Sequence, residues 1–275
     1  MGNHRKLIAD VRRELFAEDC AVVGFDFPIG VPQSFAAIHA VTNFKALLLE
    51  LGRGDWTRFY DVATNPDEIS SRRPFYPNAP GNKKQAHLLN GLGMQSINDL
   101  RRRCEEKYEG RRAACPLFWT LGANQAGKGA ITGWRDVISP AIRDDRDVVL
   151  WPFDGDLAEL MRPRKIVIAE TYPAEFYGWL FSAPLMGKGK VGVRKTAGSE
   201  LVRWAERNSV LLTDELRQQI ENGFPEGDDA FDAVVGLLGM VEVVSGRRSA
   251  SEPRNRKTRN VEGWILGQKA GADVP

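Results

Sequence analysis

Two apolar segments of the sequence each end in a carboxylate. Asp26 follows Ala21–Phe25, a short β-branched and aromatic run, and Pro28 comes two residues later. Glu170 ends the apolar run KIVIAE, and a proline again follows. Such runs are typical of buried strands in α/β proteins, in which ligands bind at the carboxyl ends of the strands. Asp26 is therefore a candidate ligand-binding acid, although an aspartate at this place can equally cap the following turn.

A second pair of carboxylates, Asp229 and Asp232, lies in the segment GDDAFDAVVGLLGMVEVV. Its spacing predicts a helix that begins at Asp228 and is apolar nearly all round, hence buried. At about 100° per residue, both acids share one side with two glycines, which let that side approach another element closely. Helix capping accounts for Asp228 and Asp229. Asp232 lies beyond the cap, and a buried carboxylate needs a cation, so a functional role is favoured for it.

These acids form a set of oxygen ligands without histidine or cysteine. Oxygen ligands of this kind select magnesium or manganese. In phosphodiester cleavage such metals activate a water molecule and stabilise the leaving oxygen. We therefore expect Asp26, Asp229 and Asp232 to be metal ligands, with Glu170 as a supporting catalytic acid.

The segment from Gly122 to Gly129 nearly matches the phosphate-binding pattern G-x-x-x-x-G-K-[ST]. Lys128 stands where the pattern requires lysine, but Gly129 replaces the Ser or Thr whose hydroxyl ligates magnesium. Gly133 also interrupts the segment where a helix has to follow. The sequence therefore favours a tight turn between elements over a nucleotide-binding loop, and ATP binding is not expected.

The order of the remaining elements indicates an α/β fold. Arg5–Glu18 has the spacing of an amphipathic helix. Residues 34–112 are mostly helical and irregular, with a charged helix from Ile97, and we interpret them as an insertion without a core of its own. Strand-like runs follow at PLFWTLG, DVVLWPF and KIVIAE. After the late helix we expect a mobile polar loop and a strand-like EGWILG, all within one domain over residues 1–275.

The composition is that of an ordinary globular protein and argues against several classes. The 275 residues are 43% hydrophobic, and 38 basic against 36 acidic residues give a net charge of +2. Nothing global therefore demands a nucleic acid or a membrane. The cysteines and histidines lack the spacing of a zinc site. Because neither a signal peptide nor a membrane span is recognisable, we expect a soluble cytoplasmic protein.

A set of short stretches covers nearly the whole chain from Val22 to Gln268: GFDFPIGVP, RRPFYP, FWTLGANQAGKGAITGW, LWPFDG, AETYPAEFYG, DDAFDAVVG and EGWILGQ. At these stretches the chain resembles the domain of unknown function family 429, whose members are predicted nucleases with an RNase H-like fold. The resemblance implies a mixed sheet in which Asp26 is the acid of the fourth strand. It also implies that Asp229 and Asp232 are the acids of the late helix and that the set binds two divalent metal ions.

The resemblance further implies three strands before the helix at Arg5–Glu18, the first of them with another acid. The chain begins at that helix, so either it was cut, or its start was chosen too late, or it is a degenerate member that has lost catalysis. The leading hypothesis is a metal-dependent nuclease, inactive in this form if the first-strand acid is essential. The alternative is a non-catalytic binding or scaffold protein. Without its usual neighbour, the strand Ala21–Phe25 has an open edge, which predicts self-association.

A run of basic residues after the late helix is the candidate contact for a nucleic-acid backbone. It consists of Arg247, Arg248, Arg254, Arg256, Lys257 and Arg259. Such a run can neutralise phosphates, although a charge run is more often a solvated tail. It lacks aromatic residues for base stacking, so it indicates backbone contact at most.

Overall fold

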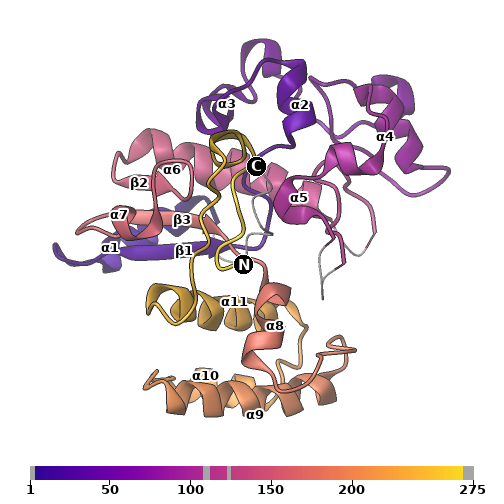
Figure 1. Ribbon diagram of the computed structural model, residues 1–275. Helices are drawn as coiled ribbons and strands as arrows, with labels where there is room; N and C mark the ends of the chain where they lie inside the picture. The colour runs from indigo at the N-terminus through magenta and orange to yellow at the C-terminus, as the bar shows by residue number, and fades with distance from the viewer. Residues whose placement is uncertain (1–3, 108–111, 123–124, 269–275) are drawn as a thin grey trace. The chain divides into compact units, whose positions relative to one another are not determined.

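The computed structural model describes residues 4–107, 112–122 and 125–268 (Figure 1). The protein is a mixed α/β structure that is mostly helical and contains a small parallel sheet. None of the described helices is both long and apolar enough to cross a membrane. The chain divides into two compact units: unit 1 comprises Met1–Glu170 and Ser251–Pro275, and unit 2 comprises Thr171–Ala250. The expectation of one domain over residues 1–275 stays a prediction.

Three parallel strands form the sheet of unit 1, in the order β1-β3-β2. β1 spans Ala21–Phe25, β2 spans Val148–Leu150 and β3 spans Ile166–Glu170. All three lie in segments that the sequence predicts as strands, since each is an apolar run that ends in turn residues. The sheet differs from the expected mixed one because the pairs among these described strands are parallel.

β1 and β3 differ in burial because they occupy different places in the sheet. β3 is central, and all of its residues are buried. β1 lies at an edge, and all of its residues are half-buried. The N–H of Ala21 donates to the carbonyl of Lys165, on the β3 side. Since backbone groups alternate in direction along a strand, those of Val22 and Gly24 point toward the edge that no other described strand pairs with.

A long helical run follows the insertion in unit 1. α5 (Ala126–Thr132), a π-helical segment (Gly133–Ile138) and α6 (Ser139–Asp144) continue one another without a break. The expectation that Gly133 interrupts a helix is therefore wrong. A Cβ atom at Gly133 would lie 2.1 Å from the ring of Phe27, so the missing side chain lets the helix pack directly on that ring.

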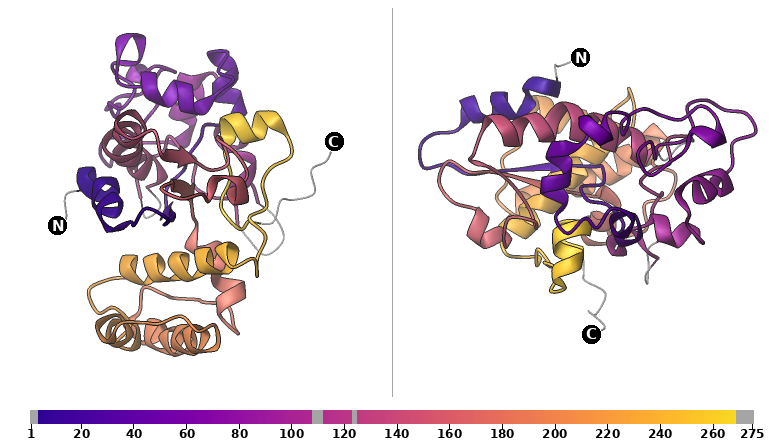
Figure 2. Two further views of the ribbon diagram at one scale, coloured as in Figure 1. Left: turned by 90° about the vertical axis from the view of Figure 1, so that its left-hand side faces the viewer. Right: turned by 90° about the horizontal axis from the view of Figure 1, so that it is seen from above.

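The first helix packs along this run (Figure 2, right). α1 spans Leu7–Glu14 and follows a 3-10 turn at His4–Lys6, within the segment predicted as an amphipathic helix. Arg12 pairs with Asp145 just after the end of α6, at 2.7 Å. The predicted first helix is thus confirmed, and it covers part of the helical run.

The insertion at residues 34–112 contains short helices joined by irregular segments, as the sequence predicts. They are α2 (Gln33–Ile38), α3 (Phe44–Glu50) and α4 (Gln85–Leu92), with 3-10 turns at Gly54–Trp56, Pro66–Glu68, Ile97–Leu100 and Arg103–Glu105. One buried core unites side chains of these elements with those of the strands, among them Phe35, Leu48 and Ile168. Side chains of residues 34–112 thus share a core with the strands, and the interpretation of this segment as an insertion stays a prediction.

Two predicted elements of this region do not form. The charged helix from Ile97 is replaced by two 3-10 turns, because Arg101 and Arg102 between them have extended backbones. The side chain of Arg102 is fully buried, so its ion pairs override helix propensity. The strand-like PLFWTLG instead forms a turn, with an isolated bridge between Tyr76 and Trp119.

The segment after unit 2 agrees with the expectation in part. Residues 247–255 form no helix or strand, as the predicted polar loop requires, and a π-helical segment at Thr258–Glu262 overlaps the end of that loop. Ile265 then forms an isolated parallel bridge with Glu170 of β3, so the strand-like EGWILG is confirmed only as this short contact. A short helix not predicted from the sequence, α7 (Leu157–Leu160), lies between β2 and β3.

The named elements of unit 2 are helices: α8 (Pro173–Leu180), α9 (Val191–Arg207), α10 (Asp214–Glu221) and α11 (Asp229–Val244). α9 and α10 lie side by side, and α11 packs against α8 (Figure 2, left). A Cβ atom at Gly239 of α11 would lie 2.2 Å from the ring of Phe176 in α8. This close approach confirms the role predicted for the glycines beside the aspartates. α9 and α10 were not predicted.

Candidate functional site

The carboxyl ends of β1 and β3 lie next to each other. Phe25 pairs with Glu170 in the parallel register of the two strands. Asp26 follows Phe25, so the two acids lie at the same end of the sheet. This is the end at which open α/β sheets bind ligands.

Glu170 is buried in an ion pair with Arg102. The guanidinium donates from Nη2 to Oε1 (2.6 Å) and from Nη1 to Oε2 (2.7 Å) of Glu170. The backbone N–H of Ile29 also donates to Oε2, at 2.7 Å. Burial raises the pKa of the Glu170 carboxyl, and the positive charge of Arg102 opposes that rise. Protein donors thus occupy both oxygens of Glu170.

Arg102 joins four segments of unit 1. It donates from Nε and Nη2 to Glu105 (3.0 and 2.8 Å), and from Nη1 to the carbonyls of Ile29 (3.1 Å) and Glu262 (3.0 Å). With Glu170, these partners belong to the insertion, the turn after β1, the C-terminal segment and the end of β3. A buried charge with this many partners is tolerated because its donors are satisfied. Sequence reasoning missed Arg102 because RRRCEE has the pattern of an exposed charged helix.

Asp26 has the opposite environment, since it is exposed to solvent. The residues after it are anchored: the ring of Phe27 lies 5.0 Å from that of Phe25, and the indole N–H of Trp134 donates to the carbonyl of Pro28 at 2.7 Å. Asp26 is therefore an accessible carboxylate at the start of a well-packed turn.

Asp232 of α11 is half-buried and paired with a lysine of unit 2. The ammonium of Lys188 contacts Oδ2 of Asp232 and lies 3.7 Å from Oδ2 of Asp228. The hydroxyl of Tyr177 donates to Oδ1 of Asp232 at 2.8 Å. The expectation that Asp232 needs a neutralising cation is thus met by a side chain of the protein. Asp229 is exposed in the first turn of the helix.

Lys188 is held through its backbone. Arg194, buried in α9, donates to the carbonyls of Lys188 (2.6 Å), Gly223 (2.8 Å) and Phe224 (2.9 Å). The side chains of the ion pair itself remain partly accessible, with 35% of Lys188 and 16% of Asp232 exposed. A partly exposed pair is weak, so a cation from solvent can compete with the ammonium.

The predicted metal ligands belong to different units, Asp26 to unit 1 and Asp229 and Asp232 to unit 2. Across residues 4–107, 112–122 and 125–268, no three His, Cys, Asp or Glu side chains are grouped so that they could hold one metal ion. The donor chemistry, carboxylate oxygen alone, suits a hard cation such as magnesium or manganese. The metal assignment therefore stays a prediction.

The basic run after α11 does not form one uniform surface. Three of its members are paired with acids: Arg247 with Glu242 (3.1 Å), Arg248 with Glu175 (3.2 Å) and Arg259 with Asp156 (2.8 Å). Three others are exposed, namely Arg254, Arg256 and Lys257. The run is also divided, because Arg247 and Arg248 belong to unit 2 and the rest to unit 1.

In the glycine-rich segment 122–129, the glycines at 127 and 129 allow close packing. A Cβ atom at Gly127 would lie 2.8 Å from the carbonyl oxygen of Leu117, and one at Gly129 would lie 2.9 Å from Cβ of Phe27. Lys128 between them is exposed on α5. Ala123 and Asn124 of the near-match lie outside the described residues. The structural role favoured from the sequence agrees with these contacts, although the element is a helix and not a tight turn.

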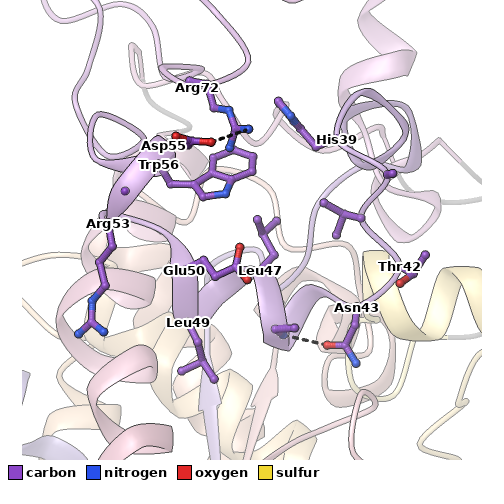
Figure 3. A pocket seen from close by; sticks show the side chains of 14 residues that line it. His39, Thr42, Asn43, Leu47, Leu49, Glu50, Arg53, Asp55, Trp56 and Arg72 are labelled. Carbon is purple, nitrogen blue, oxygen red and sulfur yellow. Dashed lines mark hydrogen bonds and ion pairs between the residues drawn. The ribbon is translucent and has the colours of Figure 1, made fainter.

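A hollow of about 730 Å³ lies on the insertion (Figure 3). Arg72 lies over the ring of Trp56, 3.8 Å from its centroid, and 3.9 Å from Asp55. The ring of His39 packs edge-on against the same indole. Burial lowers the pKa of His39, and the charge of Arg72 lowers it further by a smaller amount. Glu50 also lines the hollow. Side chains of both charges are thus present, and the lining selects no single class of ligand.

Sequence patterns singled out the acids of unit 1 and unit 2, whereas their partners Arg102 and Lys188 were not predicted.

Comparison with known proteins identifies no relative of this chain. The chain matches no protein-family model, and the comparisons with curated proteins and with solved structures give no significant match.

Proposed function

We propose that the chain is a metal-dependent nuclease of the RNase H-like class, with Asp26, Asp229 and Asp232 as ligands of magnesium or manganese. The observation that carries the proposal is the place of Asp26, an exposed carboxylate at the carboxyl end of a strand in a parallel sheet. A bound metal supplies an activated water and stabilises the leaving oxygen of a phosphodiester. The resemblance to family 429 supports the same assignment.

Glu170 acts as a positioning residue in this proposal. Its carboxylate accepts the N–H of Ile29 and both terminal nitrogens of Arg102. These bonds hold the turn after Asp26 against the end of β3. The ligand role is thus left to acids whose oxygens are reached from solvent.

Isothermal titration with manganese tests each acid separately. We expect weak binding by the full chain, lost in Asp26→Asn and in Asp232→Asn. Asp19→Asn is the control, because Asp19 lies in a turn in which it accepts the N–H of Phe16 at 2.9 Å. Equal loss in all three variants contradicts the assignment. Circular dichroism of each variant separates a lost site from a lost fold.

The ion pair of Lys188 provides a second test, because an ammonium and a metal ion compete for Asp232. Lys188→Met removes the competing charge. We expect it to tighten manganese binding roughly 3- to 5-fold, in line with the ~1 kcal/mol limit for partly exposed ion pairs. Lys190→Met, an exposed lysine of the same loop, is the matched control. Unchanged or weaker binding in Lys188→Met contradicts the competition.

A second candidate function is that of a non-catalytic binding or scaffold protein. The ion pairs of Glu170 with Arg102 and of Asp232 with Lys188 favour it, because internal cations already neutralise these two acids. The metal dependence of oligonucleotide binding distinguishes the two functions, since an inactive nuclease also fails to cleave. Binding or cleavage that requires manganese and is lost in Asp26→Asn supports the nuclease, whereas binding that is independent of manganese supports the scaffold.

A further inference from the structure

A second hollow of the insertion is lined by charged residues that are all positive. Its volume is about 340 Å³, and it lies at the start of α4. The lining residues are Pro66, Tyr76, Asn82, Lys83, Lys84 and His87. The charged members of this set are lysines, and Asn82, Tyr76 and His87 add amide, hydroxyl and imidazole groups. A concave surface of this composition attracts anions.

The ammonium groups of Lys83 and Lys84 have different environments. Nζ of Lys83 lies 5.5 Å from the ring centroid of Tyr76 and donates to the carbonyl of Thr64. Lys84 is exposed. Within the described ranges neither lysine pairs with an acid, and the neighbouring Glu68 is paired with Arg73 at 3.0 Å. The positive charge of the hollow is thus not cancelled locally.

His87 and Tyr76 add polar groups to the same lining. The Tyr76 hydroxyl lies 2.9 Å from Nδ1 of His87. In the tautomer in which the hydroxyl donates to Nδ1, the imidazole carries its proton on Nε2. That N–H is a donor suited to the oxygen of an anion.

The first turn of α4 adds to the same field. Lys84 is the N-cap residue, its side chain makes no capping bond, and the first turn contains no acid. The N–H groups of this turn and the helix dipole therefore favour a negative charge at the hollow. This contribution adds to the lysines, which provide the full charges.

We propose that this hollow binds a phosphate group, with the ammonium groups of Lys83 and Lys84 as donors and His87 in the same lining. The hollow of Figure 3 provides the contrast, because Glu50 and Asp55 accompany its arginines. The volume exceeds that of one phosphate group, so the phosphate can be free or belong to a nucleic-acid strand. The proposal is independent of the nuclease assignment, because neither a metal ion nor a cleavage step enters it.

Two probes distinguish the sources of the phosphate: inorganic phosphate followed by phosphorus NMR, and a labelled single-stranded oligonucleotide followed by fluorescence anisotropy. In the full chain, the double variant Lys83→Met and Lys84→Met is expected to weaken binding at least about tenfold, as the loss of charged hydrogen bonds predicts. Lys128→Met is the matched control, because Lys128 is exposed on α5 and outside the hollow. It is expected to leave binding unchanged.

The outcomes are distinct. Binding of the oligonucleotide alone, lost in the double variant, identifies a backbone phosphate as the ligand. Binding of inorganic phosphate, lost in the same way, identifies a free or terminal phosphate. No binding of either probe, or equal loss in Lys128→Met, overturns the proposal. Tyr76→Phe leaves the lysines in place and is expected to weaken binding less than the double variant does, with far-UV circular dichroism as the check on folding.

Discussion

β1 and β3 have the same sequence pattern and opposite environments. Each is an apolar run that ends in an acid with a proline soon after. β3 lies in the middle of the sheet, and its Glu170 is buried against Arg102. β1 lies at the edge, and Asp26 after it is exposed. The same pattern thus places one acid in the protein interior and the other in contact with solvent.

The difference shows that the same strand-end pattern can place an acid in the interior, where an internal cation neutralises it, or at the solvent-exposed surface. Arg102 is 68 residues away from Glu170 in the sequence. It reaches the carboxylate because the insertion folds back over the end of β3. Asp26 follows the edge strand and is exposed, so its carboxylate is within reach of a ligand.

The largest effect on stability is expected when the buried acid Glu170 loses its cation. Arg102→Met leaves the carboxylates of Glu105 and Glu170 buried without their cation. Removing one partner of a buried ion pair costs about 3–5 kcal/mol, so the free energy of unfolding is expected to fall by that amount. Urea unfolding followed by tryptophan fluorescence measures it.

Arg103→Met is the control for this experiment. Arg103 is the next residue, and it is exposed. A surface substitution of this kind changes stability by less than about 0.5 kcal/mol. Similar losses in Arg102→Met and Arg103→Met would show that the buried network contributes little.

An intermediate effect is expected from amide substitutions of the two acids themselves. Glu170→Gln keeps the shape of the side chain but removes the charge that faces Arg102, and we expect a loss of about 1–3 kcal/mol. Asp26→Asn is expected to stay within about 0.5 kcal/mol, because the residue is exposed. The same unfolding experiment compares the two, and an equal cost for both would remove the distinction between the acids.

The smallest effect concerns the edge of the sheet. The backbone groups of Val22 and Gly24 point away from β3, so β1 offers them to a second chain. We expect weak, concentration-dependent self-association by size-exclusion chromatography with light scattering. Val22→Pro removes one outward N–H and keeps the bonds to β3, and it is expected to shift the equilibrium to the monomer. A wild-type chain that stays monomeric at every concentration contradicts this use of the edge.

Much of the fold was predictable where one local pattern dominates. The strands at Val148–Leu150 and Ile166–Glu170, and the helix from Asp229, follow from apolar runs and helical spacing. The charged segment from Ile97 was predicted wrongly because the pattern does not show that Arg102 is buried. Gly133 was also misread, since a glycine that breaks an isolated helix instead admits the ring of Phe27 here.

The candidate site was also only partly predictable from the sequence. Asp26, Glu170 and Asp232 were selected as candidates from the sequence, because an acid in or beside an apolar segment conflicts with its surroundings. The cations Arg102 and Lys188 were not found, since long-range ion pairs leave no periodic signal. The paired basic residues Arg247 and Arg248 belong to the same class of missed contact.

The sequence by itself determined which segments are apolar, which of them extend or coil, and which acids those segments carry. These properties depend on side chains a few residues apart, and their spacing follows directly from the sequence. Only the tertiary structure decided that β3 is central and β1 is an edge. It also decided that Arg102 neutralises Glu170 and that Lys188 neutralises Asp232. The physical reason is that burial and charge pairing depend on which distant segments meet, and apolar and charged patterns alone do not specify those partners.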